Sequence, residues 1–292
     1  MNTAVSSPSA PAALPEALSN EALARESAIA QRAIRGRKRL IIGLRLAVLV
    51  IVLGGWEVAA RQKWIDPFFY SQPTLIWAQI VEWLRDGTSQ GPLWQQVAVT
   101  LEETVIGFLI GAVAGVVCGI LLGRNKLLSD VFSLYIQIAN SIPRVVLGSV
   151  FVIALGLGMA SKVALAVVMV FFVVFGNAFQ GVREADKYMI ANAQILGASP
   201  RQLTTAVVIP SAMSWILASL HVSFGFALVG AVVGEFLGAK EGIGLLISTA
   251  QGAFNASGVF AAMIVLAVVA LAADFLLSTL EKRLLKWRPA AF

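Results

Sequence analysis

The sequence predicts an all-α polytopic membrane protein with about six transmembrane helices. Hydrophobic residues make up 58% of its 292 residues, charged residues make up 13%, and the mean hydropathy is +0.83. A soluble domain would carry about 25% charged residues, so lipid must replace water over much of the surface. Six apolar segments of about 20 residues or more lead to the same conclusion, because that length crosses the hydrocarbon core of a bilayer.

The predicted spans lie in a transmembrane domain of residues 39–288, which is flanked by two tails. They cover residues 40–60, 98–123, 130–156, 161–182, 211–237 and 258–280. Residues 1–38, rich in Ala, Ser, Pro and Glu, are predicted to form a largely disordered cytoplasmic tail, in which any helix starts at about Glu16. Residues 289–292 form a short C-terminal tail.

Residues 67–94, between the first two spans, are predicted to be an external amphipathic segment. Helical spacing puts five apolar side chains after Pro73 on one face, namely Ile76, Trp77, Ile80, Trp83 and Leu84. Tryptophans at headgroup depth are typical of an interfacial helix. A shorter stretch around residues 244–253 has a similar pattern.

The basic residues predict which side of the membrane each loop faces. With the N-terminus inside, 15 Lys and Arg residues fall on the cytoplasmic side and five on the other, namely Arg61, Lys63, Arg85, Lys162 and Lys240. The positive-inside rule therefore places both termini in the cytoplasm, which requires an even number of spans. Because the basic residues cluster beside apolar segments, the net charge of +6 reflects membrane topology and no nucleic-acid partner is expected.

The second span carries a glycine every fourth residue: Gly107, Gly111, Gly115, Gly119 and Gly123. This spacing puts the glycines on one face of a helix, where a second helix can approach closely in lipid. Structural packing is the favoured interpretation of this glycine stripe. A sliding surface in a moving transporter is the alternative.

The composition excludes several kinds of site. Cys118 is the only cysteine and His221 the only histidine, so neither a disulfide framework nor a multi-histidine or cysteine-rich metal centre is expected. The sequence contains no Gly-x4-Gly-Lys-Ser/Thr loop to hold the phosphates of ATP. We therefore expect no catalytic site, no metal and no cofactor bound by this chain.

The longest predicted cytoplasmic connection, residues 183–210, has turn residues that a plain loop does not need. Lys187–Leu196 can form a short helix that Gly197 ends as a left-handed C-cap. Ser199 can cap the next helix, with Pro200 in its first turn, and Pro210 marks the start of the fifth span. The prediction is a rigid helix–turn–helix that protrudes from the membrane and docks a partner.

This connection resembles the EAA motif of the permease subunits of bacterial ABC importers. The motif reads Glu-Ala-Ala, three residues, Gly, nine residues, Ile-x-Leu-Pro. The corresponding positions here are Ala191, Asn192, Ala193, Gly197, Val207, Ile209 and Pro210, and Ala198 and Ser199 directly follow the glycine. Ala191 replaces the glutamate of the motif and Asn192 replaces its first alanine. The resemblance implies that these residues couple the chain to an ATPase.

Other segments are similar to the branch of this family that imports nitrate, sulfonates and taurine. They are Gln72-Pro73-Thr74, Ser141-Ile142-Pro143-Arg144, Gly156-Leu157-Gly158, Gly234-Glu235-Phe236-Leu237-Gly238 and Gly242-Ile243-Gly244. Glu103 departs from the branch, because it stands where arginine is usual.

This resemblance implies a type I ABC importer permease fold, multi-pass in the bacterial inner membrane, working as a homodimer by alternating access. It also implies two ATPase subunits, which bind ATP and Mg, and an extracytoplasmic solute-binding protein. The implied solute is a small anion of the sulfonate, taurine, nitrate or organic carboxylate class.

Polar and ionisable residues inside the spans are candidates for the substrate pathway because they are costly to place in lipid. The candidates are Asn140, Ser141, Pro143, Arg144 and Glu235. Arg144 follows Pro143, which should loosen the third span, and could either attract an anion or pair with Glu235 or Glu103. Glu235 could belong to an external gate or to a salt bridge. Asn140 and Ser141 could equally serve helix–helix hydrogen bonds.

Two further ionisable residues lie in the spans. His221 is expected to be a packed, hydrogen-bonded residue of the pathway or of an interface. Asp274 is expected to have no special role and to reach the cytoplasmic interface or pair with Lys282.

Two other functional classes are alternatives. An ion-gradient-driven secondary transporter needs no ATPase, but the sequence shows no inverted repeat and no series of membrane carboxylates for a proton relay. An intramembrane serine protease needs a base beside its nucleophile, and His221 and Ser223 do not face each other on a helix. Co-purification of an ATPase would separate the importer from both.

Overall fold

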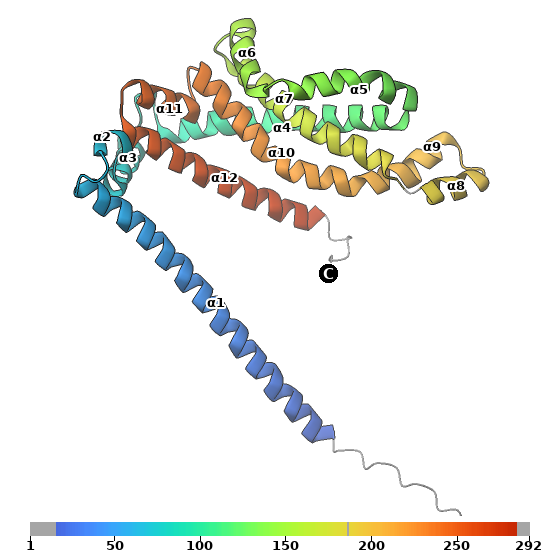
Figure 1. Ribbon diagram of the computed structural model, residues 1–292, viewed down its shortest axis with the longest axis horizontal. Coiled ribbons are helices and arrows are strands. Elements are labelled where there is room, and N and C mark those ends of the chain that lie inside the picture. The colour runs from blue at the N-terminus through green and yellow to red at the C-terminus, as the bar shows by residue number, and fades with distance from the viewer. Residues whose placement is uncertain (1–15, 186, 285–292) are drawn as a thin grey trace, which may run out of the picture. The chain divides into compact units, whose positions relative to one another are not determined.

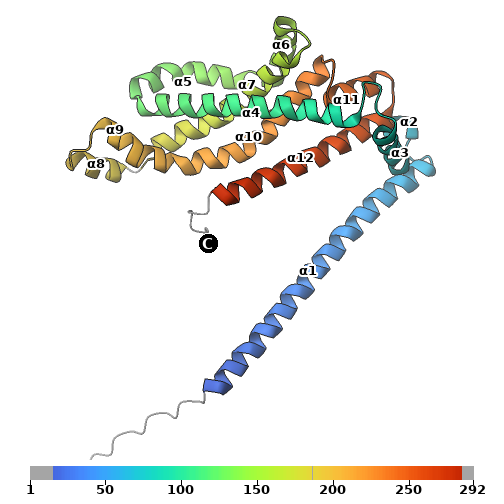
Figure 2. The same ribbon diagram turned by 180° about the vertical axis from the view of Figure 1, so that it is seen from behind.

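The computed structural model describes residues 16–185 and 187–284, nearly all of them helical (Figures 1 and 2). Within these ranges the side chains of residues 16–35, 140, 187, 280–282 and 284 are not described. The chain divides into two units, Met1–Trp64 and Ile65–Phe292.

The first unit consists of one long helix, α1 (Glu16–Arg61), whose residues Gly36–Arg61 are apolar enough to cross a membrane. Helix therefore starts well inside the predicted tail, and residues 16–38 continue into the first span without a break. Ala, Glu, Leu and Arg dominate this stretch and all favour helix. The span also supplies the helical nucleus from which a polar extension can propagate. Residues 1–15 and the predicted tail 289–292 lie outside the described residues.

The second unit contains all the other elements. In chain order they are α2 (Pro67–Tyr70), α3 (Pro73–Arg85), α4 (Leu93–Arg124), α5 (Lys126–Ser141), the 3-10 turn η1 (Arg144–Val146), α6 (Leu147–Leu155), α7 (Met159–Arg183), α8 (Lys187–Ile195), α9 (Pro200–Leu203), the π-helix η2 (Thr204–Val208), α10 (Ile209–Leu237), α11 (Ile243–Gly252) and α12 (Ala256–Leu284). By length and apolar composition, five helices of the described chain could span a membrane, or six if one bent pair is a single span. This confirms the predicted all-α class and the number of spans.

The bent pair corrects the predicted third span, residues 130–156, which is not one straight helix. Lys126–Ala139 and Arg144–Leu155 meet at an angle of 73°. Between them Ile142 is extended, with φ −77° and ψ 127°, and Pro143 follows. A proline disfavours the helical conformation of the residue before it and offers no N–H to the helix. Pro143 therefore breaks this span.

Helices α4, α7 and α10 form the centre of the second unit (Figure 1), and the glycine stripe of α4 faces α7. A Cβ atom added at Gly111, Gly115 or Gly119 would lie 2.8–2.9 Å from a carbonyl oxygen of α7. These oxygens belong to Val167, Phe171 and Phe175, which are also four residues apart. The stripe is thus a backbone-to-backbone contact, which confirms the packing interpretation.

The two kinds of extramembrane segment lie at opposite ends of the second unit. Both views place α8 and α9 at one end and α3 and α11 at the other (Figures 1 and 2). Helices α3 and α11 correspond to the two predicted amphipathic stretches. The spans therefore separate the segment that resembles a docking element from the segments predicted to be external.

Candidate functional site

The segment between α7 and α10 forms both turns that its sequence predicts. Gly197 has φ +80°, the left-handed conformation that favours glycine. Its N–H donates to the carbonyl of Gln194 (2.9 Å), and the N–H of Ala198 donates to the carbonyl of Ala193 (3.0 Å), so the end of α8 is capped. Ser199 then opens α9 with a capping box, in which its N–H donates to Oε1 of Gln202 (2.9 Å) and its Oγ accepts from the Gln202 N–H (3.3 Å).

Pro210 lies at the start of α10, as expected for the start of the fifth span, but the helix itself begins earlier. Residues Pro200–Leu237 run as one helical stretch of 38 residues, with the π-helix inside it. The N–H of Ile209 donates to the carbonyl of Thr204, five residues back. A proline at position 210 clashes with the carbonyl four residues before it, and the wider π turn relieves this clash without ending the helix. α9 is therefore continuous with α10.

The connecting segment 183–210 exposes apolar side chains beside its central turn. Ile195 is 83% exposed and Leu196 is 86% exposed, directly before Gly197. Asn192, Gly197 and Ser199 are also exposed. Sequence reasoning missed Ile195 and Leu196, although two bulky apolar residues next to a glycine C-cap are themselves a sign of a contact surface.

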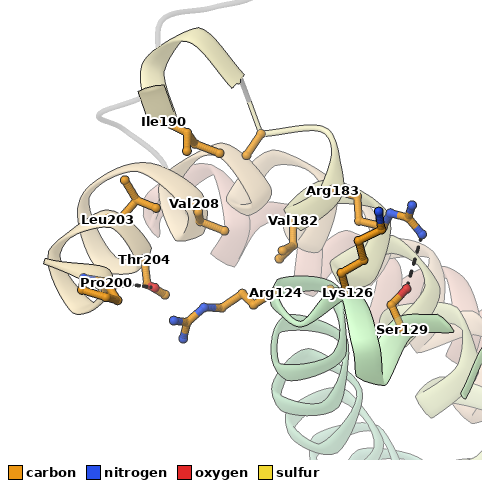
Figure 3. Close-up of a pocket in the computed structure, with 12 residues that line it drawn as sticks. Arg124, Lys126, Ser129, Val182, Arg183, Ile190, Pro200, Leu203, Thr204 and Val208 are labelled. Atoms are coloured by element: carbon orange, nitrogen blue, oxygen red, sulfur yellow. Dashed lines mark hydrogen bonds between the residues drawn. The ribbon is translucent and has the colours of Figure 1, made fainter. Parts of the chain in front are cut away.

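A cavity of about 470 Å³ lies between the connecting segment and the ends of the central helices (Figure 3). Its walls come from the end of α4, the start of α5, the end of α7 and the stretch from α8 to η2. Arg124, Lys126 and Arg183 all line it. Arg183 donates from Nη1 to the Oγ of the buried Ser129 (3.4 Å), and its guanidinium lies 5.5 Å from the ring centre of Phe179. The sequence did not predict this cavity.

Most of the predicted pathway residues lie together at the break between α5 and α6. Ser141 is the last residue of α5 and donates from Oγ to the carbonyl of Gln137 (2.9 Å). Pro143 precedes η1, and Arg144 opens it with its guanidinium carbon 4.9 Å from the ring centre of Phe172 on α7. Asn140 belongs to α5, but its side chain is not among the described ones.

Glu235, the remaining pathway candidate, lies elsewhere, in a buried polar cluster near the end of α10. It is fully buried, accepting from Thr100 Oγ1 (2.7 Å) and from the N–H of Gly244 (2.6 Å). Thr100 in turn accepts from the N–H of Ile243 (2.9 Å), and Gln96 Oε1 accepts from the N–H of Gly242 (2.7 Å). These bonds satisfy the first N–H groups of α11 and hold its start against α4 and α10.

Lys162 and Glu103 complete this cluster. The position of Lys162 corrects the count of external cations made from the sequence. Sequence reasoning counted Lys162 among the external loop cations, but it lies in α7 and is 1% exposed. Its ammonium donates to the carbonyls of Leu157 (2.7 Å) and Gly158 (3.1 Å) and attracts both Glu103 and Glu235. Glu103 is 3% exposed, and its Oε2 accepts no hydrogen bond from the described residues. A buried cation near both carboxyl groups thus comes from α7.

His221 and Asp274 form a separate contact between α10 and α12. His221 Nε2 lies 3.4 Å from Asp274 Oδ1. The expected Asp274–Lys282 pair cannot be compared with it, because the side chain of Lys282 is outside the description.

Comparison with known proteins relates this architecture to membrane transport. The chain is 30% identical over 268 residues to a putative aliphatic sulfonates transport permease protein of Bacillus subtilis (strain 168), covering 91% of this chain and 95% of the relative. It is 26% identical over 247 residues to the taurine transport system permease protein of Escherichia coli (strain K12), covering 84% and 90% of the two chains.

A solved structure of the inward-facing MetNI methionine ABC transporter shares the fold, with a TM-score of 0.54 at 20% identity over 64% of this chain and 95% of that one. Residues 107–286, more than half of the chain, match the family described as binding-protein-dependent transport system inner membrane component. With its five or six candidate spans, the chain belongs to this family and is a multi-pass ABC permease of the inner membrane.

Proposed function

We propose that this chain is the membrane-spanning subunit of an ATP-driven importer and forms the pathway for a small anionic solute. The solute arrives on an extracytoplasmic binding protein, and two ATPase subunits supply the energy. Two relatives are named as permeases for aliphatic sulfonates and for taurine. These names support the proposal that the solute is an anion of the sulfonate, taurine, nitrate or organic carboxylate class.

The connecting segment 183–210 is the observation that carries this proposal. Its exposed Ile195 and Leu196 offer an apolar contact beside a rigid turn, and α9 leads into α10 without a flexible joint. A partner that moves this segment would move α10 with it. The proposed ATPase-coupling residues are Ala191, Asn192, Ala193, Gly197, Ala198, Ser199, Val207, Ile209 and Pro210. ATP and Mg belong to the partner, so the chain itself is a transport subunit and not an enzyme.

The break at Pro143 is the proposed position of the substrate pathway. Arg144 brings a positive charge over Phe172, about halfway along α7, and Ser141 brings a hydroxyl group, with Asn140 beside it in the sequence. Exposed apolar side chains around the break, including Ile142, Val145 and Val146, support a second copy of the chain as the other wall. Glu235 is the proposed gate residue, because it holds the start of α11 against α4.

The direct test is to co-express the chain with its cognate ATPase, purify the complex in detergent and reconstitute it in liposomes. We expect the ATPase to co-purify and solute uptake to require both ATP and the loaded binding protein. Uptake driven by an ion gradient without ATP would instead support a secondary transporter and contradict the proposal. Ligand-induced thermal stabilisation of the binding protein identifies the solute.

Substitutions at Gly197 test the coupling role separately. Space around Gly197 is open, so a side chain there is opposed only by the positive φ. Valine disfavours this conformation by about 1–2 kcal/mol, whereas asparagine tolerates it. Gly197→Val should therefore uncouple ATP hydrolysis from uptake while membrane insertion persists, and Gly197→Asn should retain coupling. Normal coupled uptake by the valine variant would show that this turn does not transmit the motion.

A further inference from the structure

The cavity between the connecting segment and the central helices gathers positive charge from three helices. Arg124 is the last residue of α4, Lys126 is the first of α5, and Arg183 is the last of α7. Figure 3 shows Arg124 extended toward Pro200 and Thr204, with Lys126 and Arg183 on the other side of the α4–α5 turn. No described carboxylate lies within ion-pair distance of any of the three.

The helix dipole stabilises the positive charge of two of these residues and destabilises that of the third. Arg124 and Arg183 lie at helix C-termini, where a positive charge is favourable. Lys126 lies at a helix N-terminus, where it is unfavourable. The described carboxylates close to them in sequence do not line the cavity: Glu184 accepts from Gln180 (2.8 Å), and Asp130 is exposed on α5. A bound anion would offset the mutual repulsion of the three cations.

The walls of the cavity suit a ligand that is partly polar and partly apolar. Ser129 is 4% exposed and accepts from Arg183, which leaves its hydroxyl hydrogen for an anion oxygen. Val182, Leu203 and Val208 provide apolar wall on the side of the connecting segment.

The cavity also lies at the membrane boundary, because Arg124 and Arg183 end two of the candidate spans. Lipid phosphates lie at this depth. Leu127 and Leu128, exposed in the first turn of α5, point to a surface that acyl chains can cover.

We propose that this cavity binds the phosphate group of an anionic phospholipid, with Arg124, Lys126 and Arg183 as its cationic ligands and Ser129 as a hydroxyl donor. Basic pockets between transmembrane helices are a known means of binding anionic headgroups. Assigning the lipid to the cytoplasmic leaflet rests on the orientation in the proposed function, but the binding itself does not. A headgroup held here would contact both the α4–α5 turn and the connecting segment.

Native mass spectrometry of the full chain in detergent tests this site. Phosphatidylglycerol and phosphatidylcholine with identical acyl chains would be titrated against the wild type and against a variant with Arg124→Gln, Lys126→Gln and Arg183→Gln. We expect the wild type to prefer phosphatidylglycerol on the order of tenfold and the variant to lose that preference. Equal preference in both proteins would overturn the proposal.

Two further variants test whether the loss of lipid preference comes from the local charge, from the total charge of the protein or from misfolding. The first removes the same number of cations elsewhere, through Arg61→Gln, Arg85→Gln and Lys240→Gln, and should keep the preference for phosphatidylglycerol. The second keeps the local charge, through Arg124→Lys and Arg183→Lys, and should also keep it. Loss of the preference in the first variant would show that net charge alone attracts the lipid, which would overturn a built site.

Two competition experiments test whether the negative charge in this cavity comes instead from soluble phosphate or from acidic residues of the ATPase. Displacement of phosphatidylglycerol by millimolar inorganic phosphate would assign the cavity to a soluble phosphate and overturn the lipid proposal. Release of the lipid when the ATPase binds the wild type would assign the cations to acidic residues of that partner, with the same consequence. Retention of the lipid in both experiments supports the proposal. None of these results depends on whether ATP drives uptake.

Discussion

Lys162 illustrates how a single charge can organise the end of a helical bundle. Its ammonium is buried with two carboxylates nearby and donates to the carbonyls of Leu157 and Gly158, just before α7 begins. An isolated buried charge is very costly, whereas a paired and hydrogen-bonded one is tolerated. Glu235 accepts hydrogen bonds from Thr100 and Gly244, whereas Oε2 of Glu103 accepts none from the described residues, so Glu103 is the carboxyl group with less polar support.

This arrangement predicts an unequal response to charge removal. Lys162→Met leaves the carbonyls of Leu157 and Gly158 without their donor and removes the cation near two buried carboxyl groups, so it should lower the stability of the chain by about 1–3 kcal/mol. Adding Glu103→Gln removes one ionisable group from this buried cluster and should restore part of the loss. Thermal unfolding in detergent, followed by intrinsic fluorescence, would measure both variants. Glu102, next in sequence but exposed, provides the control: Glu102→Gln should change stability little. An unfolding temperature for the double variant at or below that of Lys162→Met would contradict this prediction.

Among the elements, the close packing of α4 against α7 depends on the glycines of α4. In lipid, apolar burial gives little drive for helix association, so close backbone packing must supply it. The four-residue spacing on both helices keeps this contact in register from Gly107 to Gly123. Gly176, on α7, has no atom near its added Cβ and so does not belong to this contact.

Gly115 in α4 and Gly176 in α7 allow a matched test of packing. A methyl group at Gly115 would lie 2.9 Å from the Phe171 carbonyl oxygen and force the helices apart, so Gly115→Ala should destabilise the chain by about 1–3 kcal/mol. Gly176→Ala meets open space and should be neutral or stabilising by up to about 1 kcal/mol, because alanine favours helix over glycine. Thermal unfolding of the two variants in the same detergent would compare them. Equal loss at both positions would mean that glycine matters here for helix flexibility and not for close approach.

For the whole molecule, the main property is the separation of its two ends by the spans. The connecting segment 183–210 and the lipid-site cations lie at one end, and α3, α11 and the Glu235 cluster lie toward the other. Burial of Lys162 removes one of the five cations counted outside, which strengthens the bias toward cytoplasmic charge. An importer needs this separation, because solute arrives on one side and ATP acts on the other.

The topology can be measured directly because the chain has a single native cysteine. In a Cys118→Ala background, Arg201→Cys should react with an impermeant maleimide only in inside-out vesicles. Lys240→Cys should react only in right-side-out vesicles. Both residues are exposed, so access depends on the side of the membrane and not on burial. The reverse labelling pattern would overturn the orientation inferred from the positive-inside rule.

Local chemistry explains which features could be predicted from the sequence. The spans follow from apolar length, the glycine contact from four-residue spacing, and the Gly197 and Ser199 turns from residues whose conformational preferences are strong. The break after Ser141 could be anticipated from Pro143, although its size of 73° could not. Pro210 shows the limit of such rules, because a π turn absorbed a proline that usually ends a helix.

By itself, the sequence determined that the chain is a multi-span helical membrane protein with a structured connection between its fourth and fifth spans. These properties depend on hydrophobicity and on contacts between residues close in the chain. Only the tertiary structure decided that Lys162 is buried near Glu103 and Glu235, that Glu235 accepts a hydrogen bond from the start of α11, and that Arg124, Lys126 and Arg183 line one cavity. Each of these groups joins helices far apart in sequence, and charge–charge contacts have no periodic pattern by which their partners could be matched in advance.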